Sequence, residues 1–251
     1  MPDPDIYDTG FVSRLFDRMA QTYGVTNYLS SFGFSEIWRR RCVNRVDWTK
    51  VRATATVLDL MSGMGECWHL VRRATACPVT GVDISPVMVR KSIHQATRNR
   101  IDGIRVRQED VLNTSLAGEC ADVIISSFGL KTFNDRQQRE LAVQVGRLLR
   151  PGGAFSFVEI SVPPFGPLRA PYMFYLRRVI PLIGKYFAGD DHSYRYLGVY
   201  TEAFSDARSF AGHLRDNRLE VTYHSYFFGC ATGVTGRKPP LTGPSETAAG
   251  K

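Results

Sequence analysis

A chain of 251 residues is long enough for one domain with a full hydrophobic core, and 43% hydrophobic residues is ordinary for a globular protein. The formal net charge of +8 leaves nucleic acid and an anionic membrane surface open as partners, but the basic residues form no single run, and most suit solvated helix faces. The five cysteines include no pair at Cys-x-x-Cys spacing, which argues against a disulfide framework and a zinc site.

The N-terminal part of the chain predicts two helices ahead of the first strand. The opening residues are acidic and polar, unlike a secretory signal, and no apolar run is long enough to span a membrane, so we expect a cytoplasmic protein. Apolar residues at helical spacing predict a helix over 11–23, and Ser35 caps a second one over 36–46. We expect residues 1–50 to form a helical lid over the crevice of the following domain.

From residue 56 onward, strand and helix patterns alternate, which predicts an α/β fold with a parallel sheet and right-handed crossovers. The predicted strands are 56–60, 78–82, 104–107, 122–127 and 153–159, with helices over 66–76, 86–99 and 135–149. A helix over 200–215 and an antiparallel strand pair, 219–228 and 230–236, close the sheet. The Pro-, Gly- and Ser/Thr-rich residues 239–251 predict a disordered tail after a core that spans 51–238.

The first strand runs into a glycine turn with the sequence VLDLMSGMGE, residues 57–66. Gly63 and Gly65 allow a sharp turn and a close approach to a ligand, as at the start of a nucleotide-binding βαβ unit. The third glycine of the dinucleotide fingerprint is missing, because Trp68 occupies its position. A dinucleotide and S-adenosylmethionine (SAM) both fit such a unit, and the missing glycine favours SAM.

Polar side chains stand at the ends of four successive predicted strands, where ligands bind in this architecture. They are Asp59, Asp83, Asp110 and Ser127. Asp83 can accept both ribose hydroxyls of an adenosine, and a carboxylate after the third strand, at Glu109 or Asp110, can accept from the adenine amino group. Asp59 and Glu66 suit the amino-acid end and the sulfonium of SAM.

An insertion at about residues 162–198 interrupts the chain before the last strands. Residues 168–183 are apolar, aromatic and basic, which suits a substrate pocket, a membrane surface or a core helix equally. The segment AGDDHSYRYL, residues 188–197, concentrates acids, a histidine, tyrosines and an arginine between apolar flanks.

Several of these motifs together resemble the C-methyltransferases of ubiquinone and menaquinone biosynthesis, the UbiE-type family. The resemblance spans residues 11–238. It is carried by VLDLxxGxG (57–65), GVDxS (81–85), SFGL (127–130), LLRPGG (148–153), PLIG (181–184), AGDDHSYRYL (188–197) and the N-terminal segment 11–33.

This resemblance implies a class I SAM-methyltransferase fold, Rossmann-like, with a mostly parallel seven-stranded sheet and helices on both faces. The implied cofactor is SAM, and the residues expected at it are Tyr23, Asp59, Gly63, Met64, Gly65, Asp83, Ile84, Asp110, Val111 and Ser127. Met64 replaces the family's threonine between the glycines, while Lys131 and Thr132 replace an arginine and an asparagine after SFGL. These departures bear on the methyl acceptor more than on methyl transfer.

The implied reaction is an in-line displacement at the methyl carbon, in which positioning and desolvation supply most of the catalysis. A hydroquinone ring carbon becomes nucleophilic once the neighbouring hydroxyl loses its proton, so a base is needed. His192, Asp191 and Asp190 are the candidate bases, although a solvent-facing role for His192 is equally consistent. Arg195 and Lys131 are candidates to stabilise the phenolate.

We therefore predict an enzyme that C-methylates a prenylated benzoquinol or naphthoquinol ring. An O- or N-methyltransferase of a small aromatic metabolite and a non-catalytic SAM-fold partner in quinone biosynthesis stay open as alternatives. The expected partner is a small aromatic or lipid-soluble quinol substrate, with peripheral contact at the inner face of a membrane and a homodimer also open. Nucleic acid is not expected, because the sequence after the fourth strand lacks the Asn/Asp-Pro-Pro-Tyr tetrapeptide.

Overall fold

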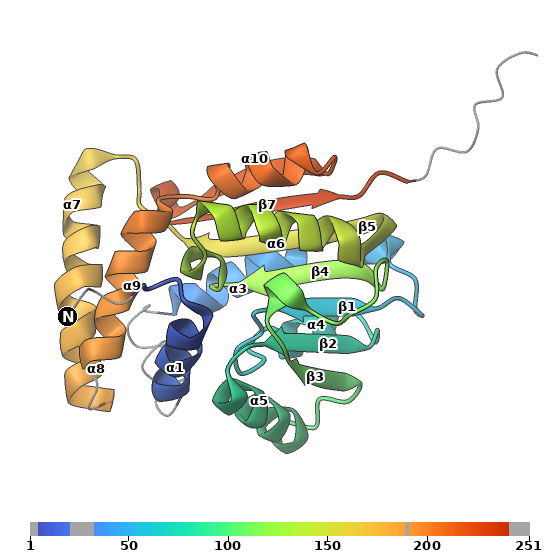
Figure 1. The fold of residues 1–251 in the computed structure, drawn as a ribbon, viewed down its shortest axis with the longest axis horizontal. Helices are drawn as coiled ribbons and strands as arrows, with labels where there is room; N and C mark the ends of the chain where they lie inside the picture. Colours follow the sequence, from blue (N-terminus) through green and yellow to red (C-terminus); the bar gives the residue numbers. More distant parts are fainter. Residues whose placement is uncertain (1–4, 21–32, 189–190, 241–251) are drawn as a thin grey trace, which may run out of the picture.

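The computed structural model describes residues 5–20, 33–188 and 191–240, and its centre is a seven-stranded sheet (Figure 1). The strand order is β3-β2-β1-β4-β5-β7-β6. The strands are β1 (Val57–Leu60), β2 (Val79–Asp83), β3 (Ile104–Gln108), β4 (Ala121–Ser127), β5 (Leu149–Ile160), β6 (Glu220–Tyr226) and β7 (Ala231–Arg237). The first five are parallel, and β7 pairs antiparallel with both β5 and β6. The predicted fold class is confirmed.

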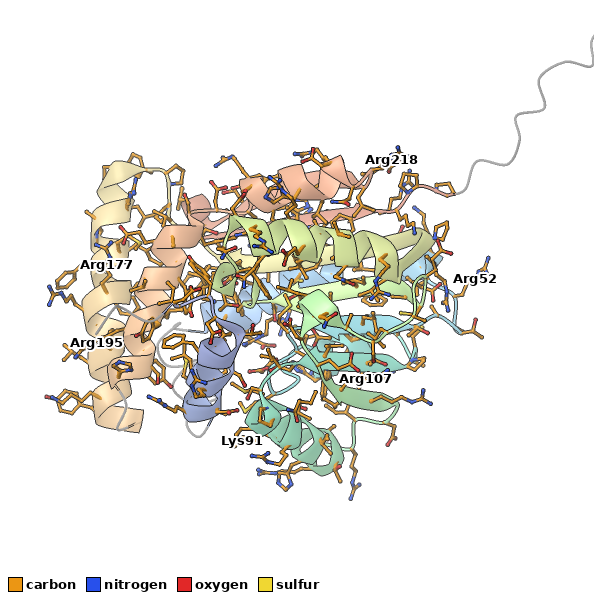
Figure 2. All side chains as sticks on the ribbon, viewed as in Figure 1. Arg52, Lys91, Arg107, Arg177, Arg195 and Arg218 are labelled. Atoms are coloured by element: carbon orange, nitrogen blue, oxygen red, sulfur yellow. The ribbon has the colours of Figure 1, made fainter. Side chains whose placement is uncertain are left out.

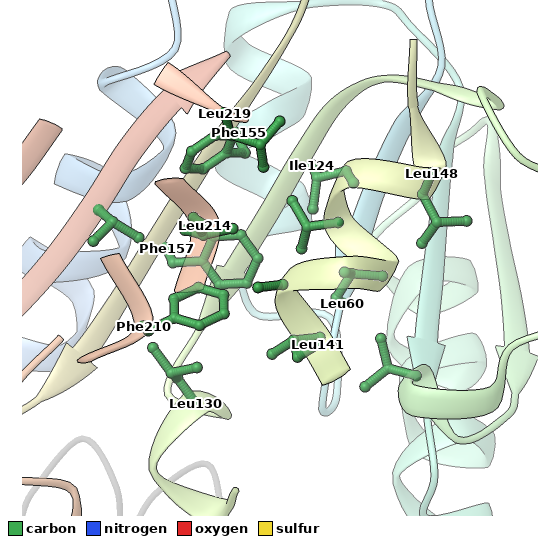
Figure 3. Packing of buried hydrophobic residues seen from close by; sticks show 14 of the residues in the cluster. Leu60, Ile124, Leu130, Leu141, Leu148, Phe155, Phe157, Phe210, Leu214 and Leu219 are labelled. Atoms are coloured by element: carbon green, nitrogen blue, oxygen red, sulfur yellow. The ribbon is translucent and has the colours of Figure 1, made fainter. Parts of the chain in front are cut away.

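The central strands are apolar throughout because helices cover both faces of the sheet. Every residue of β1 is buried, whereas the edge strand β3 is largely exposed and carries arginines. One face packs on α6 (Asp135–Leu148) and α10 (Arg208–Asp216), and the resulting core contains Leu141, Phe157 and Phe210 (Figure 3). The other face packs on α3 (Phe34–Asn44), α4 (Trp68–Ala74) and α5 (Pro86–Arg98).

Local sequence signals fix the starts of the two longest crossover helices. Ser85 caps α5 by accepting from Met88 N at 3.0 Å, and Pro86 occupies the first helical turn. Asn134 and Gln137 form a reciprocal capping box at the start of α6. Both helices therefore begin directly after the loops that leave the carboxyl ends of β2 and β4, so those loops are held in place from one side.

A helical layer lies beyond the carboxyl ends of the parallel strands (Figure 1). It consists of α1 (Thr9–Met19), α7 (Gly166–Phe174), α8 (Ile180–Ala188) and α9 (Asp191–Phe204), with a π-helical turn, η4 (Tyr175–Val179), between α7 and α8. These helices share an apolar cluster that includes Leu15, Leu176 and Tyr200. Short 3-10 helices are η1 (Trp48–Lys50), η2 (Val111–Asn113), η3 (Leu130–Thr132) and η5 (Phe227–Gly229).

Helix α3 begins at Phe34 with Gly33 at its N-cap position, so the predicted cap at Ser35 is wrong. Two other differences from the predicted boundaries change the course of the chain. The single helix expected over 200–215 is instead the end of α9 and the whole of α10. The break comes at Ser205, whose backbone has φ of +60° and whose carbonyl accepts from Val162 N at 2.7 Å. Strand β5 starts at Leu149 rather than at 153, because Leu149 pairs with Ala121 ahead of an irregularity in the ladder. Tertiary contacts decide both points, and local sequence does not report them.

The basic residues are distributed around the molecule, as the sequence pattern suggests. The labelled side chains Arg52, Lys91, Arg107, Arg177 and Arg218 lie on different sides of it (Figure 2). The lid role of residues 1–50 and the disorder of the tail stay predictions.

Candidate active site

A cleft opens at the carboxyl ends of β1, β2, β3 and β4. Among the described residues, α1 and α3 form its outer wall and the strand ends form its floor. Of the predicted cofactor residues, Gly63, Asp83, Ile84, Asp110, Val111 and Ser127 line it. The acids predicted at the tips of β2 and β3 therefore face one shared hollow, since the carboxyl ends of parallel strands lie along one edge of a sheet.

The turn after β1 requires its glycines. Gly63 and Gly65 have φ of +56° and +81°, which side chains with a Cβ rarely adopt. A Cβ on Gly65 would lie 2.3 Å from Cε3 of Trp68, so the glycine also lets the Trp68 ring pack against the turn. In a dinucleotide site the third glycine leaves room for the helix to pack closely on the strand. Here the Trp68 side chain fills that space.

Asp83, at the end of β2, is held by the same turn. Its carboxylate accepts from Gly63 N at 2.8 Å and from Ser85 N at 2.9 Å, and it lines the cleft. Burial raises the pKa of Asp83 to about 6, even though the two backbone hydrogen bonds oppose that shift. The side chain is therefore fixed in orientation and still has lone pairs that can accept from a ligand in the cleft.

Asp59, Met64 and Gly65 do not line the cleft. Asp59 is 2% exposed, and its Oδ2 accepts from Trp68 Nε1 at 2.9 Å, behind the glycine turn. Burial, together with the neighbouring Glu66 carboxylate, raises the pKa of Asp59 to about 8. Met64 packs against Ala20 and Met88. These residues shape the turn from behind, while Tyr23, the remaining predicted cofactor residue, lies outside the described residues.

The opposite end of the cleft is formed after β3. Asp110 Oδ1 accepts from Leu112 N at 2.9 Å, which fixes the start of η2, and the buried Val111 faces the cleft. Glu109 also lines the cleft, and its carboxylate pairs with Arg107 at 2.8 Å. Partial burial raises the pKa of Glu109, but hydrogen bonds from Thr114 and Ser115 and the Arg107 charge outweigh it, so the pKa is lowered. This end offers an apolar slot with carboxylates at its rim.

Helix α1 supplies cleft residues that the sequence did not point to. Val12 and Phe16 line the cleft, and Asp17 Oδ1 accepts from Ser85 Oγ at 2.6 Å. Lys91 Nζ donates to Ala20 O at 2.6 Å, which ties the end of α1 to α5. The sequence predicted a helix over the crevice here, but it did not predict which residues of that helix line the cleft.

A second, smaller cavity adjoins the cleft. The two hollows share Phe16, Phe128 and Thr132 on their walls. Most of the second lining is aromatic or aliphatic and comes from α1, α9 and β5; it consists of Leu15, Phe16, Met19, Ser35, Phe128, Lys131, Thr132, Ile160, Ser193, Tyr194, Tyr196, Leu197 and Tyr200. Phe128 stands between the hollows with φ of +64°, an unusual backbone state for a bulky residue.

Among the described residues that line this second cavity, Lys131 is the only cation. It is 5% exposed, and its Nζ donates to Glu159 Oε1 at 2.8 Å and to Phe128 O at 3.0 Å. Glu159 is fully buried, and its Oε2 accepts from Lys131 N at 3.0 Å. The ammonium is therefore paired and fixed in place, on a residue that lines a mostly apolar cavity.

The other predicted catalytic residues lie on α9. His192 and Arg195 are exposed, and the His192 ring lies 5.4 Å from the Tyr196 ring. Asp191 starts α9, and its side chain and Asp190 lie outside what the structure describes. The polar segment AGDDHSYRYL is thus largely one helix, which turns Ser193, Tyr194 and Tyr196 to the cavity and His192 and Arg195 outward.

The donor set of the cleft fits SAM. The Asp83 carboxylate could accept from ribose hydroxyls, and the slot at Val111 could hold an adenine. Glu66 Oε1 is buried and has no hydrogen-bond partner among the described atoms, so it can accept from a charged amino group. The strand order, the glycine turn and this cleft define a class I SAM-dependent methyltransferase fold.

The comparisons with known proteins narrow that class. The chain belongs to the ubiE/COQ5 methyltransferase family, whose model matches residues 5–238. It is 29% identical to a demethylmenaquinone methyltransferase of Thermus thermophilus over 226 residues, which is 90% of this chain and 100% of that protein. It is 32% identical to the ubiquinone/menaquinone biosynthesis C-methyltransferase UbiE of Acidiphilium cryptum, over 88% of this chain and 87% of that one.

A solved structure shows the same fold. A putative S-adenosyl-L-methionine-dependent methyltransferase from Methanococcus maripaludis superposes with a TM-score of 0.58 at 15% identity, covering 96% of this chain and 98% of that one. The suspected family is therefore confirmed, and this chain is a methyltransferase for which family and fold imply SAM.

Proposed function

We propose that this enzyme transfers a methyl group from SAM to a ring carbon of a prenylated benzoquinol or naphthoquinol. The observation that carries the proposal is the second cavity, which is aromatic, adjoins the cofactor cleft and contains one fixed ammonium, that of Lys131. Such a cavity suits a flat apolar ring with an ionisable hydroxyl. The relatives from Thermus thermophilus and Acidiphilium cryptum are named for methylation of this class of compound.

The residues of this chain position the acceptor and polarise it. SAM, when bound, supplies an electrophilic methyl group on a positively charged sulfur. Lys131 Nζ donates to two protein oxygens, so its third hydrogen is available to an acceptor hydroxyl, and the ammonium favours the ionised form of that hydroxyl. The phenolate then makes its neighbouring ring carbon nucleophilic. Phe16 and Phe128 exclude water from the passage between the hollows.

Lys131 is thus proposed to stabilise the phenolate. His192 and Asp191 stay predictions for the base that removes the hydroxyl proton. His192 is exposed beside Tyr196 and would act only from the rim of the cavity. Arg195 is also exposed, so the geometry favours Lys131 over Arg195 for the phenolate.

Incubation with methyl-labelled SAM and a panel of acceptors tests the proposed function. Reduced demethylmenaquinol and a demethylated ubiquinol precursor should be methylated at carbon, while phenols and amines of similar size should stay unlabelled. The oxidised quinone is the matched control, because it lacks the ionisable hydroxyl and should not react. Label found on oxygen or nitrogen, or on the phenols and amines alone, would contradict the proposal and favour the O- or N-methyltransferase alternative.

We further propose that the outer side of α7 and α8 contacts an anionic membrane surface, where a prenylated acceptor resides. Residues 161–188 contain no acid and carry Arg169, Arg177, Arg178 and Lys185. Phe165, Phe174, Leu182 and Tyr186 are 53–80% exposed on this segment. The two helices run in line along one edge of the molecule (Figure 1). Within the described residues no helix has the length and apolarity to cross a membrane.

Co-sedimentation with phosphatidylglycerol vesicles tests this contact. Replacing Phe174 and Tyr186 by glutamate should lower the vesicle-bound fraction by roughly tenfold, because it removes apolar insertion and adds repulsion. Val143→Glu is the matched control, since Val143 is 49% exposed on α6, away from this face. Equal binding by the double variant, or equal binding of the unmodified enzyme to uncharged phosphatidylcholine vesicles, would contradict the proposal.

A further inference from the structure

One buried cation faces the cofactor cleft. Arg39, in the middle of α3, is 7% exposed and is the only cationic side chain among the described residues that line the cleft. Its guanidinium lies over the Phe128 ring, 5.1 Å from the centroid, and its Nη2 lies 3.8 Å from Glu66 Oε1. Its positive charge therefore lies at the wall of the cleft, beside the Glu66 carboxylate.

The position of Arg39 along the cleft identifies what it can bind. Asp83 and Asp110 mark the adenosine end, so the amino-acid end of the cofactor lies by the glycine turn, where Glu66 stands. Four acids line the cleft, namely Glu66, Asp83, Glu109 and Asp110. Among the described lining residues, no cation other than Arg39 can offset the charge of a ligand carboxylate. An amino acid carries one charge of each sign, and a neighbouring carboxylate and guanidinium match both.

We propose that Arg39 binds the carboxylate of SAM and that Glu66 binds its ammonium group. Glu66 Oε2 accepts from Met64 N at 3.1 Å, and this holds the carboxylate, while Oε1 has no hydrogen bond within the described part of the chain. The separation of 3.8 Å between Nη2 and Oε1 is longer than a hydrogen bond, so Oε1 can still accept from a ligand ammonium while the Arg39 guanidinium lies beside it at the same end of the cleft. The inference rests on the cofactor of the proposed function but not on its methyl acceptor.

Helix α3 is anchored so that Arg39 is presented in a fixed place. Cys42 Sγ donates to Ser156 O at 3.3 Å, and Ser156 Oγ donates to Cys42 O at 2.7 Å. Burial raises the pKa of the Cys42 thiol to about 12, so it stays neutral and keeps donating. Trp38 packs in the same cluster against Phe128. A side chain held this way loses little freedom when a ligand binds.

Calorimetric titration with two ligands that differ only at the carboxylate tests the inference. Arg39→Gln should weaken binding of S-adenosylhomocysteine by roughly 10- to 100-fold, because a charged hydrogen-bond partner is lost. The same variant should bind decarboxylated S-adenosylhomocysteine as the unmodified enzyme does. Arg40→Gln is the matched control, since Arg40 is exposed on the same helix and should change neither affinity. Arg39→Lys should recover part of the loss.

Two results would overturn the inference. Equal weakening of both ligands by Arg39→Gln, in a variant that keeps its melting temperature, would show a structural role for Arg39. Unchanged affinity for S-adenosylhomocysteine in that variant would place the carboxylate elsewhere. Absence of binding to the unmodified folded enzyme would instead overturn the cofactor assignment itself, so the two failures are distinguishable.

Discussion

Replacing Asp83 by alanine should raise the dissociation constant for S-adenosylhomocysteine by roughly 100-fold or more. The variant loses a carboxylate that can accept from both ribose hydroxyls, and hydrogen bonds to a charged group contribute about 1.5–3 kcal/mol each. It also frees Gly63 N and Ser85 N, which that carboxylate fixes. Isothermal titration calorimetry measures the change directly.

The same substitution should leave the protein folded, which separates lost binding from lost structure. Burial raises the pKa of Asp83 from 3.8 to about 6, so ionisation of Asp83 costs folding free energy, and its contribution to stability falls as pH rises through about 6. Removing the charge at pH 8 should therefore not lower the melting temperature through electrostatics. Asp102→Ala is the control, because Asp102 is an exposed acid near β3. Unchanged affinity in Asp83→Ala would remove Asp83 from the cofactor site.

Replacing Lys131 by methionine should lower the free energy of unfolding by about 3–5 kcal/mol and stop methyl transfer. The substitution leaves the Glu159 carboxylate, which is 0% exposed, without its charged partner. For a chain of this length the melting temperature should fall on the order of 10 °C. Urea denaturation gives the free energy, and Lys185→Met, at an exposed lysine of α8, is the matched control.

The double variant Lys131→Met, Glu159→Gln distinguishes the two effects. It removes the uncompensated charge, and the single amide oxygen can still accept from one of the two N–H groups, Ile160 N or residue 131 N, that donate to separate oxygens of Glu159. Most of the lost stability should return, but methyl transfer should not, because the ammonium is still missing. Recovery of activity along with stability would deny Lys131 its proposed role. A double variant as unstable as the single one would contradict the ion-pair explanation.

The strand ends could be predicted because the signals there are local. An apolar run, a glycine turn and an acid at the next strand end imply the same edge of a parallel sheet, and Gly63, Asp83 and Asp110 meet there. Asp59 has the same pattern, but its side chain points behind the turn toward Trp68. Strand periodicity predicts on which face of the sheet a side chain lies. It does not predict which side chain it contacts there, as Asp59 contacts Trp68.

Which side chains of the outer wall face the cleft could not be predicted from these signals. Arg39 stands among three consecutive arginines of one helix, and only the docking of α3 on β4 and β5 distinguishes the buried one from exposed Arg40. Phe16 likewise depends on how α1 packs against α5 and α9. The segment with His192 was attractive for its composition, but helical phase decides which side chains reach the cavity, and Tyr194 faces it while His192 does not.

A crystal structure with S-adenosylhomocysteine bound tests the central claim most directly. The account predicts the ribose hydroxyls on the Asp83 carboxylate, the amino-acid end between Arg39 and Glu66, and the sulfur facing the opening between Phe16 and Phe128 into the second cavity. A ligand bound outside this cleft, or one whose sulfur faces away from the cavity that contains Lys131, would contradict it.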